Sequence, residues 1–336
     1  MAPSPSDDII TVDGLDVVYP DGTRAVDGVS FRVRRGEFFG FLGPNGAGKS
    51  TTIKTLTTLL RKTSGRVSVA GQDLDQAPEQ IRRSIGVLSQ DTVVDVDLTG
   101  RENLLLFGRL QHVPRSTLEE RVDELLKVVE LEEAASKPAG RYSGGMRKRL
   151  DLASALVHEP KLLFLDEPTT GLDPQSRSAL WEYLETINRE KGVTIFLTTQ
   201  YMEEADRLCQ RIAIIDHGHL IGGGTPHELK AALGGETIEL SFEPPADSDL
   251  ISRSARVLGT VEGLSHIARS LSGLSANAPN AGRMISAVVT TLAKEDIHPS
   301  ALSVSSPTLD DVFLRLTGRR IRSEELDRKT TEPFLS

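Results

Sequence analysis

The sequence predicts an α/β fold built on a mainly parallel sheet, followed by a small α+β domain. Apolar runs of strand length alternate with amphipathic, helix-length segments; the runs are residues 37–42, 161–166, 193–197 and 212–215. Strands and helices that alternate in this order form a parallel sheet that helices cover on both faces. The pattern ends near Gly234 and Gly235. A chain of 336 residues suits two domains, because one domain usually has about 100–200 residues.

The first half of the chain contains predicted strands and then predicted helices. Alternating apolar residues predict strands at 9–12, 15–19 and 29–33, with Pro20, Asp21 and Gly22 forming a hairpin turn. Helical spacing predicts a helix at 50–61. The stretch of about residues 95–160 is rich in helical patterns, with helices predicted at 98–110, 118–131 and 146–158.

The part beyond Gly235 predicts a smaller unit. A strand is expected at 237–242, a helix around 266–272, a helix at 285–294 and a strand at 301–304, in a ferredoxin-like arrangement. The highly charged residues 319–336 are predicted to be disordered. The expected domains are therefore 1–234, which includes the helical stretch, and 235–318.

The composition restricts the classes of function. A net charge of −9 argues against a nucleic-acid binder, which needs a positive field. The single cysteine, Cys209, excludes an internal disulfide. No window approaches the roughly 18 apolar residues of a membrane span, and the first residues lack the pattern of a secretory signal. We therefore expect a protein of the cytosol.

A glycine-rich loop follows the apolar run 37–42 and precedes the helix predicted at 50–61. Its glycines and the start of the helix present backbone N–H groups and a positive dipole end to phosphates. Lys49 is expected to reach the β- and γ-phosphates of a nucleotide, and the Ser50 hydroxyl to bind Mg²⁺. The full set of loop residues expected to bind nucleotide is Gly43, Pro44, Asn45, Gly46, Ala47, Gly48, Lys49, Ser50 and Thr51.

Two carboxylates end the apolar run 161–166 or follow it directly. Asp166 can hold Mg²⁺ through water, and Glu167 can act as the general base for the attacking water.

A second glycine-bearing motif, Ser143, Gly144 and Gly145, precedes the helix predicted at 146–158. Ser143 suits the N-cap of that helix, and glycines in a first turn are costly unless a group such as a phosphate must approach the backbone closely.

Together these motifs resemble the ATPase of ABC transporters over about residues 9–230. The resemblance implies a P-loop NTPase cassette with a mixed sheet core, a β-subdomain and a helical subdomain. It further implies that Gln90 contacts Mg²⁺ and senses the γ-phosphate, that Asp173 lies across a dimer interface, and that Tyr19 stacks on adenine. The cofactors implied are ATP and Mg²⁺. Each ATP would lie between the P-loop of one copy and the residues 143–145 of another.

Several residues differ from the usual family pattern. Tyr142 and Met146 replace the usual Leu and Gln, and Gln200 replaces the switch His. A Gln side chain can donate a hydrogen bond to a γ-phosphate but cannot carry positive charge. These departures, with the segment 307–314, resemble the daunorubicin/doxorubicin-resistance subfamily of drug exporters, in which the ATPase pairs with a separate membrane permease.

The resemblance implies a homodimeric ATPase on the cytoplasmic face of the membrane that powers drug efflux through a permease. A lipid or glycan exporter would have the same ATP-site residues and stays open as an alternative. A soluble ABC ATPase that acts on ribosomes or DNA, and a switch-type GTPase, fit less well. The apolar stripe Leu309, Val312, Phe313 and Leu316, capped by Thr308 and Asp311, is either a helix that closes its own domain or a docking helix.

Overall fold

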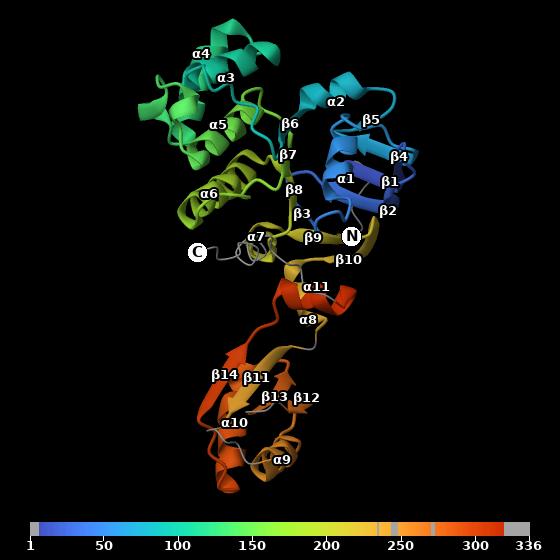
Figure 1. Ribbon diagram of the computed structural model, residues 1–336, viewed down its shortest axis with the longest axis vertical. Helices are drawn as coiled ribbons and strands as arrows, with labels where there is room; N and C mark the ends of the chain where they lie inside the picture. Colours follow the sequence, from blue (N-terminus) through green and yellow to red (C-terminus); the bar gives the residue numbers. More distant parts are fainter. Residues whose placement is uncertain (1–6, 234, 243–247, 270–272, 319–336) are drawn as a thin grey trace, which may run out of the picture. The chain divides into compact units, whose positions relative to one another are not determined.

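The structure is a computed structural model in which residues 7–233, 235–242, 248–269 and 273–318 are described (Figure 1). The chain divides into two compact units, with the boundary between Thr225 and Pro226. We predicted this boundary at 234/235. It falls earlier because helix α8 (Pro226–Ala231) packs against helix α11 (Leu309–Thr317) of the second unit. The predicted disordered tail, 319–336, lies outside the described residues.

A six-stranded sheet is the centre of the first unit. Its strands run in the order β10 (His219–Gly224), β9 (Arg211–Asp216), β3 (Phe38–Leu42), β8 (Thr194–Thr199), β7 (Leu162–Asp166) and β6 (Ile85–Leu88). All neighbours are parallel except β10, which forms an antiparallel hairpin with β9. Every residue of β3, β7 and β8 is buried, as expected of parallel strands covered on both faces.

A second, antiparallel sheet has the order β2 (Arg24–Arg34), β1 (Asp8–Val18), β4 (Ser64–Val69) and β5 (Gln72–Asp73). The strands predicted at 9–12 and 15–19 form one strand, β1, whose register with β2 shifts between Val12 and Leu15. The two sheets of this unit share one core, because Phe31 of β2 lies 5.7 Å, centroid to centroid, from Phe39 of β3.

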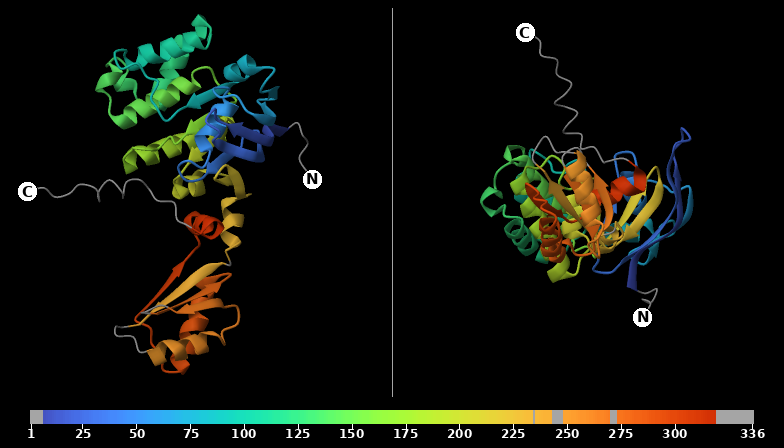
Figure 2. Two further views of the ribbon diagram at one scale, coloured as in Figure 1. Left: turned by 45° about the vertical axis from the view of Figure 1, so that its right-hand side comes forward. Right: turned by 90° about the horizontal axis from the view of Figure 1, so that it is seen from below.

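The helices of the first unit surround these sheets. They are α1 (Lys49–Leu56), α2 (Pro78–Ser84), α3 (Gly100–Leu110), α4 (Arg115–Val128), α5 (Gly144–Leu156), α6 (Pro174–Lys191) and α7 (Met202–Leu208), with the short 3-10 helices η2 (Glu132–Ala134) and η3 (Ala139–Arg141). Figures 1 and 2 show α3, α4 and α5 on the opposite side of the six-stranded sheet from β1, β2 and β4. The helix predicted at 50–61 ends at Leu56, because Thr58 adopts a left-handed φ of 66°.

The second unit has the element order β11 (Glu236–Ser241), α9 (Ser248–Leu258), β12 (Ser265–Arg269), β13 (Gly273–Ala278), α10 (Ala281–Lys294) and β14 (Ala301–Ser305). The strand order is β12–β13–β11–β14, all antiparallel. Both long helices, α9 and α10, pack against this sheet. This βαββαβ order confirms the ferredoxin-like prediction.

One prediction for this unit was wrong. The helix expected around 266–272 is instead strand β12 up to Arg269, and residues 270–272 lie outside the described residues. Most of β12 is exposed and its residues show no buried alternating face, so pairing with β13 decides its conformation. Within the described residues, no helix combines the length and the apolarity that a membrane crossing needs.

Candidate functional site

The glycine-rich loop lies between the carboxyl end of β3 and the start of α1. Gly48 has a φ of 108°, and a Cβ there would lie 2.5 Å from the carbonyl oxygen of Ala25. A Cβ at Gly43 would lie 2.3 Å from the carbonyl oxygen of Ile215. Both positions therefore exclude any other residue, because the loop backbone packs directly against β2 and β9. The loop contains the other predicted residues, Pro44, Asn45, Gly46 and Ala47.

The first turn of α1 is suited to an anion. No side chain caps this helix, and its first turn contains no acidic residue. The N–H groups of a first turn have no partner within the helix and lie at the positive end of its dipole. The arrangement of this loop and helix fits a nucleotide phosphate.

Lys49 points back toward the loop. Its buried ammonium donates to the carbonyl oxygens of Gly43, at 2.8 Å, and Pro44, at 3.1 Å, and lies 3.3 Å from a carboxylate oxygen of Glu167. Burial lowers the pKa of Lys49, and the charge of Glu167 opposes this shift. The sheet thus brings Lys49 and Glu167, which are far apart in the sequence, into one ion pair.

Asp166 ends strand β7 and lies beside Ser50. Its Oδ1 accepts hydrogen bonds from the Ser50 hydroxyl at 3.2 Å and from the Thr198 hydroxyl at 2.6 Å. Hydroxyl and carboxylate oxygens are ligands that Mg²⁺ prefers, so the donor set fits this ion. Thr198 was not among the predicted residues. Its place at the end of β8, next to β7, was the signal that could have identified it.

Glu167 has a strained backbone. Its φ is 49°, in the left-handed region that non-glycine residues rarely occupy, while its N–H donates to the carbonyl oxygen of Thr198. Such a conformation costs on the order of 1–3 kcal/mol and is typical of functional sites. The carboxylate also accepts a hydrogen bond of 3.4 Å from the hydroxyl of Thr170.

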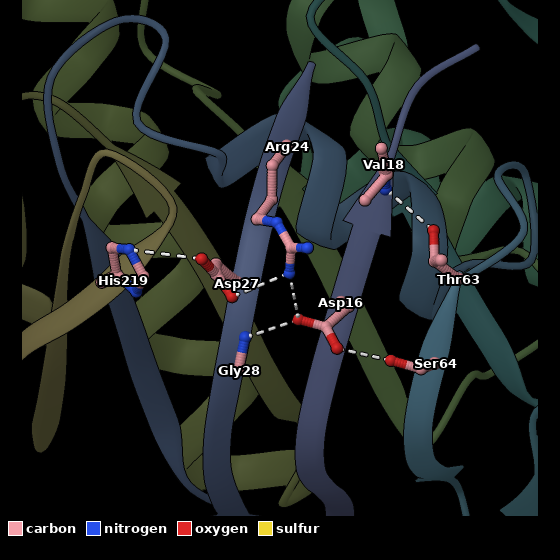
Figure 3. Close-up of polar contacts among 8 residues, drawn as sticks. All are labelled: Asp16, Val18, Arg24, Asp27, Gly28, Thr63, Ser64 and His219. Atoms are coloured by element: carbon pink, nitrogen blue, oxygen red, sulfur yellow. Dashed lines mark hydrogen bonds and ion pairs between the residues drawn. The ribbon is translucent and has the colours of Figure 1, made fainter. Parts of the chain in front are cut away.

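Tyr19 directly follows β1 and reaches the P-loop helix. Its hydroxyl lies 3.1 Å from the Thr51 hydroxyl, which places the ring beside the first turn of α1. The end of β1 is held in place by the Val18 N–H, which donates to the Thr63 hydroxyl at 2.9 Å. Figure 3 shows Asp16 nearby, accepting hydrogen bonds from β2 and from Ser64 of β4.

Charged groups of β2 and β10 extend this network. Arg24 lies 3.4 Å from Asp16 and 3.0 Å from Asp27, and His219 of β10 lies 3.5 Å from Asp27 (Figure 3). The hydrogen bond from Ser64 is the main cause that lowers the pKa of Asp16, and the N–H of Gly28 adds to it. These contacts fix the strand that positions Tyr19.

Gln200 follows strand β8, next to the strand end that bears Asp166. Its Oε1 is buried and has no hydrogen-bond partner among the described residues. An unsatisfied buried polar atom is costly, so the position suits a ligand that completes its hydrogen bonding. Four residues later in the chain, Glu204 is fully buried on α7, and its Oε1 accepts from the indole N–H of Trp181 at 3.0 Å. Sequence analysis did not identify Glu204.

The second glycine motif and Asp173 lie at two neighbouring helix starts. Ser143 is the N-cap of α5, and its hydroxyl accepts from the Met146 N–H at 3.2 Å. Asp173 is the N-cap of α6, and its Oδ2 accepts from the Ser176 hydroxyl at 2.6 Å. A Cβ at Gly145 would lie 2.5 Å from that same Ser176 oxygen, so Ser176 connects the two starts.

Gly144 differs from Gly145. A Cβ added at Gly144 would meet no atom within 4 Å, so the backbone there is open on the side where a side chain would stand.

Gln90 is exposed in the segment between β6 and α3, and its carbonyl oxygen accepts from the Lys148 ammonium at 3.3 Å. Lys148 and Asp151, which contact this segment from α5, were not predicted. An aspartate between two leucines, Leu150 and Leu152, was the signal available in the sequence.

Comparison with known proteins gives consistent matches. A family model described as ABC transporter matches residues 26–170. The daunorubicin resistance ATP-binding protein DrrA3 of Streptomyces coeruleorubidus is 43% identical over 94% of this chain and 99% of its own length. The Nod factor export ATP-binding protein I of Ralstonia nicotianae is 40% identical, over 94% of this chain and 95% of that protein.

A solved structure is also similar. It is the dimeric, post-hydrolysis state of an ATP-binding cassette bound to ADP and Pi, with a TM-score of 0.60 and 26% identity. The match covers 64% of this chain and 98% of that one.

Proposed function

This chain belongs to the ATP-binding subunits of ABC transporters, and we propose that its ATP hydrolysis powers export of an antibiotic-type compound through a separate membrane permease. One observation supports ATP hydrolysis most directly. Four side chains meet at one edge of the sheet: Lys49, Ser50, Asp166 and Glu167. The drug-export part is supported by the relative named for daunorubicin resistance, which matches nearly the whole chain.

In the proposed site, each side chain has one role. Lys49 leaves its loop carbonyls and Glu167 to bind the β- and γ-phosphates, while Tyr19 stacks on the adenine. Glu167, released from Lys49, accepts a proton from the attacking water. Gln200 donates from its amide NH₂ to the γ-phosphate, and its buried Oε1 accepts a hydrogen bond from the attacking water.

Ser50, Asp166 and Gln90 are proposed to hold Mg²⁺. The first two already share a hydrogen bond of 3.2 Å, so their oxygens lie close enough to bind one ion. When bound, Mg²⁺ would neutralise charge that develops on the transferred phosphoryl group. The Thr198 hydroxyl, at 2.6 Å, fixes the orientation of the Asp166 carboxylate.

We place a second copy of the chain over this site. Ser143, Gly144 and Gly145 of that copy would contact the γ-phosphate, with Asp173 at the interface. The open backbone at Gly144 supports a close approach from outside the chain. The similar solved cassette, which is dimeric with ADP and Pi bound, gives further support.

The permease is proposed to dock on an apolar groove near Gln90, at the cytoplasmic face of the membrane. The groove has a volume of about 270 Å³, and its apolar lining includes Leu59, Val93 and Phe107. The side chains of Leu59 and Val93 are 72% and 53% exposed. Exposed apolar side chains around a groove are typical of protein-binding surfaces. The second unit is proposed to regulate or assemble the complex, because the proposed ATP-binding residues all lie in the first unit.

Export of a lipid or glycan is the alternative. It is favoured by the 40% identity to a Nod factor export subunit, and it requires the same ATP-site residues. A non-transport ABC ATPase is disfavoured by the exposed groove and by the net charge of −9.

The test is co-expression with its candidate permease, identified by co-purification from membranes, in a drug-sensitive host. Daunorubicin is the probe for efflux. We expect efflux with the parent chain and none with Glu167→Gln. ATP hydrolysis without efflux of daunorubicin, but with transport of a lipid or glycan, would support the alternative.

A further inference from the structure

Two side chains of α5 hold the segment that contains Gln90. Helix α5 begins directly after Ser143, and Lys148 and Asp151 lie three residues apart on it, so they share one face. The segment 89–94 lies between β6 and α3 and belongs to neither element. Contacts from α5 therefore determine where this segment sits.

Asp151 binds the C-terminal half of the segment, residues 92–94. Its Oδ1 accepts hydrogen bonds from the N–H groups of Val93, at 3.1 Å, and Val94, at 3.2 Å. Its Oδ2 accepts from the Thr92 hydroxyl at 2.5 Å. The Asp151 side chain is 1% exposed, and a carboxylate this deeply buried is costly unless it is hydrogen-bonded. The segment provides those hydrogen bonds.

Lys148 binds the N-terminal end of the segment, at Ser89 and Gln90. Its ammonium donates to the carbonyl oxygens of Ser89, at 2.9 Å, and Gln90, at 3.3 Å. Burial lowers the pKa of Lys148, while the charges of Asp151, Asp166 and Asp91 oppose this shift. Lys148 is thus close enough to the proposed Mg²⁺ ligand Asp166 to interact with it electrostatically.

The segment also contributes to the apolar groove. The Val93 side chain is 53% exposed and lines that groove, while its own N–H donates to Asp151. One residue therefore connects an accessible surface to the helix that begins at the Ser143 motif.

We propose that Lys148 and Asp151 are positioning residues that clamp the segment 89–94 to α5, so that Gln90 and the Ser143–Gly145 motif move as one body. This inference rests on the proposed function. A permease that displaces Val93 then shifts the Ser143 motif through Asp151. In the chain without a permease, the clamp keeps Gln90 at a fixed position relative to the Ser143–Gly145 motif.

The test uses the full chain without a permease and compares Asp151→Asn with Ser154→Ala. Ser154 is the matched control, because it is buried on the same helix and donates only within it, to the Leu150 carbonyl. Thr92→Val is a second variant. It removes the hydroxyl that donates to Asp151 from an exposed residue, and it leaves the buried Asp151 carboxylate unchanged. Lys148→Arg keeps the positive charge and is compared with Lys148→Met.

For Asp151→Asn, we expect hydrogen exchange at Val93 and Val94 to speed up about tenfold, the effect of losing a charge-assisted hydrogen bond. The kcat for ATP should fall about tenfold while KM changes less than about twofold, because affinity depends on Lys49 and Tyr19. Thr92→Val should show both effects more weakly. Lys148→Arg should retain more activity than Lys148→Met, and Ser154→Ala should match the parent.

Faster exchange with an unchanged kcat would show that the contacts are only structural and would overturn the proposal. Unchanged exchange in both Asp151→Asn and Thr92→Val would show that there is no clamp. A parent chain without ATPase activity would instead contradict the proposed function, and the exchange measurements would still decide whether the clamp exists.

Discussion

At the residue scale, Lys49 is held by groups that a nucleotide would replace. Its ammonium has two loop carbonyl oxygens and the Glu167 carboxylate around it, and burial lowers its pKa. A phosphate would supply negative charge to this buried cation. We expect ATP binding to break the ion pair, so the proposed base is freed only when its substrate is present.

Replacing either partner of this pair should have a different effect. Glu167→Gln should keep ATP binding and lower kcat by about 10²–10⁴, the usual contribution of a general base, so that an ATP-bound dimer accumulates. Lys49→Ala should lose nucleotide affinity. Equilibrium ATP binding and steady-state hydrolysis, measured on both variants, separate these effects. Hydrolysis by Glu167→Gln at the parent rate would exclude Glu167 as the base.

Gln200 is the second residue whose role can be tested directly. Gln200→Ala removes the proposed donor to the γ-phosphate and should lower kcat about 10²-fold, as for other single donors to a developing charge. Gln200→His restores a donor at the same position and should retain much of the activity. Turnover is measured at saturating ATP. Full activity of the alanine variant would mean that this position is idle.

At the scale of elements, helices α6 and α7 meet at a buried carboxylate. Glu204 of α7 accepts from the indole of Trp181 on α6, and burial is the main cause that raises its pKa. The hydroxyls of Thr199 and Thr169, together with the indole, oppose that shift. The folded chain therefore keeps the Glu204 proton to a higher pH than the unfolded chain does.

This difference predicts a pH dependence. Because the folded pKa lies above the unfolded value of about 4.3, stability is greatest below that value and falls as pH rises toward the folded pKa. Glu204→Gln keeps an acceptor for Trp181 but cannot ionise. Its Tm relative to the parent should therefore increase as the pH rises above the unfolded pKa of about 4.3. Glu203→Gln, on the exposed neighbour, should give no such trend, and parallel Tm curves for Glu204→Gln and the parent would contradict the prediction.

The elements also show what could be predicted from sequence. The buried strands β3, β7 and β8 and the loop before Lys49 were predictable, because apolar runs and glycines are determined locally. The N-cap roles of Ser143 and Thr308 were predicted and are confirmed. Local patterns gave the wrong structure for β12, an exposed strand whose conformation depends on its partner.

Other site residues were missed because they act across the sequence, and a place at a strand end or between two leucines does not by itself indicate the contact. Thr198 reaches Asp166 only when β8 pairs with β7, and Asp151 contacts a segment about sixty residues earlier only when α5 packs beside it. Neither contact leaves a spacing pattern in the sequence. Long-range packing therefore determines the parts of the site that support the motif residues.

At the scale of the whole molecule, the proposed composite site predicts complementation. Lys49→Ala has an intact Ser143 motif, and Ser143→Arg has an intact P-loop, so a mixed dimer can rebuild one complete site. We expect each variant alone to be inactive and the mixture to recover at most about half of the activity per mixed dimer, if one site suffices. No recovery on mixing, together with parent activity that is independent of dilution, would argue for a monomeric enzyme.

The stripe on α11 gives a second test at this scale. Leu309, Val312 and Phe313 are buried in the single chain, whereas Leu316 is 44% exposed. Burying the charge of Phe313→Asp should cost several kcal/mol and lower Tm sharply, whatever the stripe binds.

Leu316→Asp separates the two interpretations of this stripe, because its position is accessible and the variant should fold. If α11 only closes its own chain, Leu316→Asp should keep the parent Tm, ATPase activity and efflux. If α11 docks on a second subunit or on the permease complex, Leu316→Asp should keep Tm while efflux falls several-fold, since a charge then enters an apolar interface. Because the other apolar residues of the stripe are already buried within the chain, we expect the first outcome. Loss of efflux at an unchanged Tm would establish α11 as an interface.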